Sequence, residues 1–173
     1  MEILENRSEW QAAFQQGWLR HYQATGETNW KLYNLPNNTI APSGKGLALS
    51  QHRLALISSA GGYLPATQAP FDAENALGDY TIRRFPVTTP PEQLAFAHTH
   101  YDHTAVNTDQ QVLLPLGHLH DLVTAGVIGE LAPAVISFMG YQPDIARVID
   151  ETIPAILSAA EAMRVAGALL VPA

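Results

Sequence analysis

Residues 98–103, with the sequence HTHYDH, hold three of the seven histidines of the 173-residue chain and one aspartate. Imidazole and carboxylate groups bind divalent metal ions, and they also transfer protons near neutral pH. On an extended strand, side chains two positions apart share a face, so His98 and His100 should point the same way. We therefore expect a proton-transfer site or a divalent-metal site here. The candidate catalytic residues are His98, His100, Asp102 and His103, and the candidate metal ligands are the three histidines.

Read literally, H-x-H-x-D-H is the two-metal motif of metallo-β-lactamase-like hydrolases, in which bound metals generate hydroxide. That fold supplies further histidine and aspartate ligands downstream, whereas this chain has no histidine after His120. A metal-dependent hydrolase or lyase stays one alternative. Another is a purely structural network at a strand end, in which Asp102 orients an imidazole and Tyr101 packs beside it.

A second group of candidates follows the apolar run at residues 54–58, which predicts a buried strand. The run stops at a serine pair and a glycine pair, and strand ends in α/β folds commonly line binding sites. We expect this turn and the histidine cluster to enclose a small-molecule pocket. The candidate substrate-binding residues are Ser58, Ser59, Gly61, Gly62 and Tyr101.

The elements that must position these residues alternate along the chain. Strands are expected at 54–58, 80–87, 93–98, 133–140 and 168–173, the last of them buried, and helices at 8–23, 115–126 and 145–165. Pro154 should kink or split the last helix. This alternation predicts a three-layer, Rossmann-like α/β fold, with a mostly parallel sheet and helices on both faces. We expect a single domain over 1–173, in which 1–50 form a helix and an extended connection (25–46) and 51–173 the α/β core.

Aromatic side chains recur at every fourth position in the first helix, which makes it amphipathic. Such a row of rings packs on the core of the protein or on a partner, either another subunit or a second copy. The candidate interface residues are Trp10, Phe14, Trp18 and Tyr22.

Composition narrows the range of partners. The net charge of −7, with only 9 lysines and arginines, disfavours nucleic acids and anionic membranes, which are polyanions. Small molecules or proteins are the expected partners. The chain has no cysteine, which excludes disulfides, thiolate zinc sites and a thiol nucleophile of its own. No apolar run approaches the roughly 18 residues of a membrane helix, and the N-terminus lacks a secretory signal, so we expect a cytoplasmic protein.

Four segments, taken in order, resemble the selenoprotein B family of the glycine, sarcosine, betaine and D-proline reductases. They are SSAGGYLPATQAPFDAENALGDYTIRRFP, HTHYDHTAVNTDQQVLLPLGHLHDLVTAGVIGELAP, SFMGY and ALLVPA, and the likeness runs from about Leu54 to Ala173. In that family the HTHYD run belongs to the same segment.

The resemblance implies a subunit of an anaerobic reductase that cleaves the C–N bond at the α-carbon of a small amino acid. Its attacking group would be a selenocysteine or cysteine, because a selenolate or thiolate is ionised and strongly nucleophilic near neutral pH. That residue would follow the segment matched by residues 169–173, where this sequence stops. Either the reading frame was cut at a selenocysteine codon, or the chain is a short relative without the reductive half, which is the expectation we favour.

On both readings the 173 residues cannot perform the cleavage alone. We expect an oxidoreductase-family protein that binds an amino-acid-like molecule, with the histidines binding its carboxylate or shuttling protons. A non-catalytic binding or assembly subunit is a further alternative.

Overall fold

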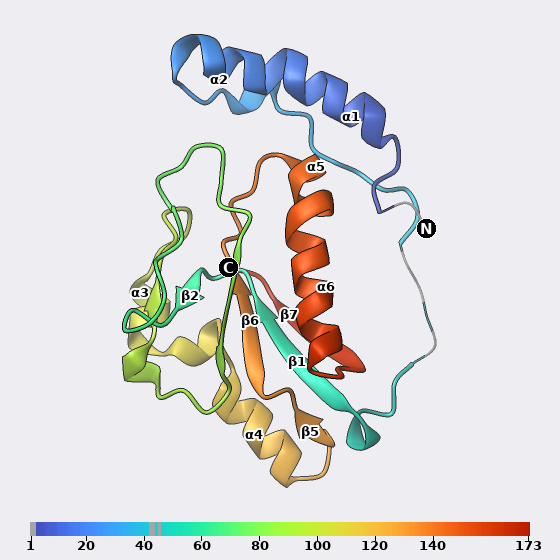
Figure 1. The fold of residues 1–173 in the computed structure, drawn as a ribbon, viewed down its shortest axis with the longest axis vertical. Helices are drawn as coiled ribbons and strands as arrows, with labels where there is room; N and C mark the ends of the chain where they lie inside the picture. Colours follow the sequence, from blue (N-terminus) through green and yellow to red (C-terminus); the bar gives the residue numbers. More distant parts are fainter. Residues whose placement is uncertain (1–2, 42–43, 45) are drawn as a thin grey trace.

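The computed structural model describes residues 3–41, 44 and 46–173. Its central strand is β1 (Arg53–Ser58), which is buried from Leu54 onward. β1 pairs in parallel with β7 (Gly167–Val171) on one side and with β5 (Glu130–Leu131) and β6 (Ala134–Phe138) on the other. β3 (Ile82–Pro86) runs antiparallel to β6 at the edge of the sheet (Figure 1). The sheet is therefore mostly parallel, as expected.

Helices cover both faces of this sheet because consecutive residues of β1 point in opposite directions. Leu54 and Leu56 pack with Leu119 of α4 (Leu116–Thr124) in one apolar cluster. Ala55 and Ile57 belong to the opposite cluster, which α6 (Ile153–Ala162) covers (Figure 1). The predicted three-layer α/β architecture is confirmed, while a Rossmann-like topology in the strict sense stays a prediction.

Two predicted strands differ from the expectation. The strand expected at 93–98 reduces to β4 (Ala95–Phe96), which pairs with β2 (Gly62–Tyr63) outside the main sheet. Gly61 has a φ of 70° and turns the chain away from the end of β1, so β2 and its partner β4 lie outside the main sheet.

The prediction that β7 is buried is wrong. The side chains of Leu169 and Leu170 are 37% and 68% exposed. β7 pairs with β1 alone, so its outer edge meets no other strand of the described chain.

The helix expected at 145–165 is continuous but changes its winding. It runs through α5 (Ile145–Arg147), a π-helical turn η6 (Val148–Thr152) and α6, in which Pro154 lies in the first turn. A proline has no N–H to donate to the preceding turn, and the wider π-helical winding accommodates this loss. Asp144 starts the helix, because its carboxylate accepts hydrogen bonds from the backbone N–H groups of Ala146 and Arg147.

The N-terminal helix packs on its own chain. It consists of α1 (Arg7–Phe14), the π-helical turn η1 (Gln15–Leu19) and α2 (Arg20–Thr25). The rings of Trp10, Phe14 and Trp18 stack in a row, with centroid distances of 5.1 and 5.5 Å, and Tyr33 meets all three edge-on.

These three side chains are 7%, 2% and 0% exposed. The predicted partner interface of Trp10, Phe14, Trp18 and Tyr22 is therefore wrong for its first three members, since the chain itself buries them.

The connection after this helix is irregular except for the short 3-10 turns η2 (Trp30–Leu32) and η3 (Leu49–Gln51). Residues 42, 43 and 45 of the expected connection lie outside the described residues. Within the described ranges, no helix is both long and apolar enough to cross a membrane.

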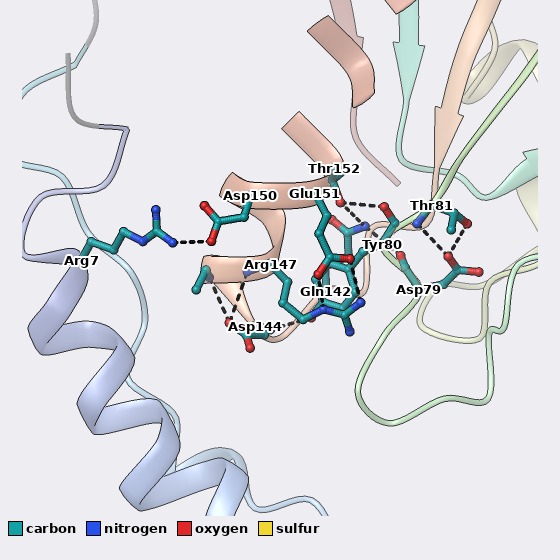
Figure 2. Close-up of polar contacts among 11 residues, drawn as sticks. Arg7, Asp79, Tyr80, Thr81, Gln142, Asp144, Arg147, Asp150, Glu151 and Thr152 are labelled. Carbon is teal, nitrogen blue, oxygen red and sulfur yellow. Dashed lines mark hydrogen bonds and ion pairs between the residues drawn. The ribbon is translucent and has the colours of Figure 1, made fainter. Parts of the chain in front are cut away.

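Polar contacts join the helix that contains η6 to two distant segments (Figure 2). The Arg7 guanidinium in α1 pairs with the Asp150 carboxylate at 2.5 Å. On the other side, the Thr152 hydroxyl donates to the carbonyl of Tyr80 at 3.1 Å, and the Arg147 guanidinium lies 3.9 Å above the Tyr80 ring. The helix formed by α5, η6 and α6 is thus linked both to the N-terminal helix and to the segment before β3.

Candidate functional site

The carboxyl ends of three parallel strands meet at Ser59, directly after β1. The Ser59 carbonyl accepts a hydrogen bond from the N–H of Gly140, just past β6, at 2.9 Å. Its Oγ accepts another from the N–H of Ala173, just past β7, also at 2.9 Å. Ligands of open α/β sheets bind at this edge.

His98 is buried against this junction, with 6% of its surface exposed. Its Nδ1 accepts a hydrogen bond from the backbone N–H of His100 at 3.0 Å, so the neutral ring carries its proton on Nε2. Burial, helped by His100 and His103 nearby, lowers the pKa of His98 to about 4. At neutral pH this imidazole is therefore an uncharged hydrogen-bond donor.

Gly140 lies between His98 and Ser59. A Cβ placed on it would be 3.2 Å from Ser59 Oγ and 3.4 Å from His98 Nε2. Gly140 was not among the predicted site residues, although it is the last position of the strand expected at 133–140. Only the sheet order shows that it sits at the same edge as Ser59.

Two other members of the cluster hold the loop in place, Tyr101 by a hydrogen bond to the turn after β1 and His103 by a hydrogen bond within the loop. His103 Nε2 donates to the carbonyl of His98 at 2.6 Å, and the Tyr101 hydroxyl donates to the carbonyl of Ala60 at 3.1 Å. The two rings stack with their centroids 4.5 Å apart. Burial raises the pKa of Tyr101 to about 12, so its hydroxyl stays a donor.

The predicted three-histidine metal site is not formed. The described residues contain no group of three histidine, aspartate or glutamate side chains that could hold a metal ion. The physical reason is that backbone groups engage Nδ1 of His98 and Nε2 of His103, while the His100 ring stacks on Tyr141.

The hydrogen bonds described for Asp102 go to Thr104 and not to an imidazole. Its Oδ1 accepts hydrogen bonds from the N–H and the hydroxyl of Thr104 at 2.9 and 2.7 Å, at the start of α3 (Thr104–Thr108). These bonds are the main reason that the pKa of Asp102 is lowered. The expected role of orienting an imidazole is therefore not supported, because the hydrogen bonds described for this carboxylate start a helix.

The pocket predicted between the glycine turn and the cluster stays a prediction, and its residues in the turn lie inside the protein. Ser58, Gly61 and Gly62 are buried. A Cβ on Gly61 would lie 2.4 Å from the carbonyl oxygen of Ala97, so the glycine permits a close backbone approach rather than a ligand contact.

A cavity of about 240 Å³ instead opens on the other side of the cluster, at His100. The His100 ring stacks on Tyr141 with a centroid distance of 3.8 Å and an interplanar angle of 6°. Trp30 meets Tyr141 edge-on at 5.9 Å. The cavity is lined by Thr28, Trp30, Ala73, Glu74, Asn75, Ala76, Thr99, His100 and Tyr141.

Residues 24–163 match the family described as glycine/sarcosine/betaine reductase selenoprotein B (GRDB). The chain belongs to this family. Over 108 residues it is 31% identical to D-proline reductase subunit gamma of Acetoanaerobium sticklandii, an alignment that covers 62% of this chain and 43% of that protein. The chain thus spans less than half of the length of this curated relative. No solved structure matched.

The family match confirms the resemblance from Leu54 to residue 163 and extends it towards the N-terminus, because it begins at residue 24; the ALLVPA segment lies beyond the match. It therefore includes Trp30 and Glu74, two cavity-lining residues of this selenoprotein B-family chain that the sequence analysis did not select. No local motif marks them, since they come from segments far from the HTHYDH run.

Proposed function

We propose that this chain is a reductase-associated protein of the selenoprotein B type that binds a small amino-acid-like zwitterion in the cavity beside His100. The sulfur or selenium for reductive cleavage would come from outside these residues, because the sequence has no cysteine. The observation that carries this proposal is the cavity itself, which adjoins the HTHYDH segment.

The chemistry of the lining suits both ends of a zwitterion. Glu74 supplies a negative charge, and the rings of Trp30 and Tyr141 offer π-faces that attract an ammonium group. Asn75 also lines the cavity, and because its Oδ1 accepts a hydrogen bond from the Leu77 N–H, its amide nitrogen is the donor that could hold a carboxylate. A volume of about 240 Å³ is below the range of drug-sized pockets, so the ligand would have few atoms.

The strand-end junction suits the delivery of a redox group. The resemblance implies that the redox residue of the family follows the segment matched by residues 169–173, which lies beyond the family match. Ala173 bonds to Ser59, and Gly140 separates Ser59 from His98. A selenolate or thiolate arriving there would meet the Nε2–H of a neutral imidazole, which would donate a hydrogen bond to it.

Titration of the full chain with glycine, glycine betaine and D-proline, followed by amide chemical shifts in NMR, tests the binding proposal. At least one ligand should give saturable shifts at residues 73–76, 99–100 and 141. Glu74→Gln and His100→Ala should each weaken this binding, whereas His118→Ala, exposed on α4, should not. Absence of saturable shifts with all three ligands would overturn the proposal.

A non-catalytic assembly subunit is the second candidate, and β7 favours it. Its outer edge is open and apolar, with Leu170 68% exposed. Open strand edges are templates for pairing with another chain. In this candidate function, a strand from another subunit of a reductase complex would extend the sheet at β7.

A further inference from the structure

One hydrogen-bond donor at the strand-end junction has no partner in the described part of the chain. Nδ1 of His98 accepts from the N–H of His100, and no hydrogen bond described for the His98 ring uses Nε2. The unpaired side-chain atoms that are sealed inside the described chain belong to other residues, namely Trp18, Arg53, Gln110 and Ser137. Nε2 of His98 is not one of them, so it reaches the molecular surface although the residue is only 6% exposed. The fold thus positions this N–H and leaves it open to a ligand.

Ser59 supplies a second donor beside the first. Its Oγ accepts the N–H of Ala173 at 2.9 Å, and the hydrogen bonds described for this residue give the hydroxyl hydrogen no acceptor. A Cβ on Gly140 would lie 3.2 Å from this oxygen and 3.4 Å from Nε2 of His98, so both polar atoms border the space above Gly140. One acceptor atom in that space can therefore bridge the two donors.

Gly140 keeps this space open. The glycine itself is exposed, whereas Ser59 and His98 are both buried beside it. A larger residue at position 140 would cover both donors with its own side chain. Donors that the fold holds in place in this way stabilise an anion without having to reorganise.

The two donors suit a soft anion better than a carboxylate. Burial lowers the pKa of His98 to about 4, so at neutral pH its ring donates without carrying a charge. The serine hydroxyl is uncharged as well. A carboxylate is strongly hydrated and is held best by charged, two-pronged donors. A thiolate or selenolate is larger and less strongly hydrated, and it accepts through a single atom.

We propose that Ser59 and His98 form a two-donor site for one thiolate or selenolate, which binds over Gly140. In the proposed function the sulfur or selenium comes from outside these residues, and the site rests on that proposal. It adds the Ser59 hydroxyl as a second donor and Gly140 as the entrance. Hydrogen bonds to the charged form lower the pKa of the bound thiol or selenol, so the site keeps this group ionised.

Three fluorinated probes of similar size test the site on the full chain at pH 8.5: 2,2,2-trifluoroethanethiolate, 2,2,2-trifluoroethanol and trifluoroacetate. The chain has no cysteine that could form a mixed disulfide with the thiol. In NMR titrations, the thiolate should give saturable amide shifts at residues 59, 98 and 140 and should move the Nε2 nitrogen resonance of His98. The alcohol and the carboxylate should bind about ten-fold more weakly. Equal binding of either one would overturn the proposal.

Variants place the anion over the glycine. Gly140→Ala covers the donors and should weaken thiolate binding at least about ten-fold, and Ser59→Ala, which removes one donor, should weaken it about five-fold. Gly46→Ala, where a Cβ meets no atom within 4 Å, is the matched control and should bind as the parent chain does. Unchanged binding in a folded Gly140→Ala chain contradicts the proposal. Thermal unfolding shows whether both variants fold, and if neither does, the three probes on the parent chain decide.

The readouts separate this site from the cavity at His100. Saturable shifts at residues 73–76, 99–100 and 141 with an amino acid, but none at 59, 98 and 140 with the thiolate, would overturn the junction site alone. Thiolate binding without amino-acid binding would support the junction site and overturn the cavity.

A free thiol and a cysteine of another polypeptide share the same chemistry. A glycylcysteinylglycine peptide with blocked ends, compared with trifluoroethanethiolate at equal thiolate concentration, tells the two sources apart. Tighter binding of the peptide indicates a polypeptide source and weaker binding a small thiol, and both results support the site.

Discussion

The backbone N–H of His100 donates a hydrogen bond to Nδ1 of His98 at 3.0 Å, so these two histidines lie in a turn and not on one face of a strand. The bond fixes the buried His98 as an uncharged ring facing Gly140, and the His100 ring points to Tyr141. The HTHYDH segment therefore contributes His98 to the strand-end junction and His100 to the cavity.

His98 should make the stability of the fold depend on pH. Its pKa of about 4 in the folded chain is below the value of 6.5 expected after unfolding, so the unfolded state binds the proton more readily. The stabilisation is complete above pH 6.5 and is lost as the pH falls towards 4. We expect a loss of about 1 kcal/mol at pH 5, less than the roughly 2 kcal/mol of an unscreened shift, because nearby side chains are open to water.

Urea unfolding at pH 7 and pH 5 measures this loss. His98→Gln should unfold with a smaller difference between the two pH values than the parent chain. His118→Gln, which changes an exposed histidine, should keep the full difference. An unaltered pH dependence in His98→Gln would show that other groups cause it.

Gly140→Ala should destabilise the junction by about 1 kcal/mol, because its Cβ would press on two packed groups, Ser59 Oγ and His98 Nε2. Denaturant unfolding at pH 7 measures the effect. Gly46→Ala is the control, since a Cβ there meets no atom within 4 Å. An equal effect of both substitutions would mean that backbone entropy, and not the contact with His98, is responsible.

Asp102→Ala should lower the unfolding midpoint slightly and leave ligand affinity in the His100 cavity unchanged. The carboxylate starts α3 through Thr104 and lies outside the cavity lining. Thermal unfolding and the glycine, betaine and D-proline titrations measure the two effects. A loss of affinity with an unchanged midpoint would restore Asp102 as a site residue.

Trp18→Ala should cost about 3–5 kcal/mol of unfolding free energy, because the ring is fully buried between Phe14, Trp30 and Tyr33. If the N-terminal helix packed on a partner and not on its own chain, Trp18→Ala would leave the unfolding free energy of the isolated chain nearly unchanged. Leu35→Ala, at a position that is 83% exposed, is the control and should change stability by less than about 0.5 kcal/mol.

Leu170→Lys should reduce self-association or partner binding through the β7 edge and leave the fold intact, since a charge on an exposed edge strand opposes pairing. Sedimentation velocity over a range of concentrations measures association. Leu157→Lys, at an exposed leucine of α6, tests whether any added charge has the same effect. Identical behaviour of the two variants would remove the support that β7 gives to an assembly role.

The local pattern of the sequence determined the elements and the layers. An unbroken apolar run predicted β1, and the four-residue spacing from Trp10 to Tyr22 predicted the first helix. These patterns work because helix and strand repeats are properties of short stretches of backbone. The extent of burial of β7 could not be predicted in this way, because it depends on whether another strand lies beside it.

The sequence by itself also determined the family and the presence of three histidines at one loop. Only the tertiary structure decided where these rings point. His98 accepts from the His100 N–H, His103 donates to the His98 carbonyl, and His100 stacks on Tyr141. The tertiary structure likewise brought Trp30 and Glu74 to His100. Packing against a segment far along the chain set the direction of His100, and hydrogen bonds within the folded loop set those of His98 and His103; the spacing of the histidines alone predicted neither.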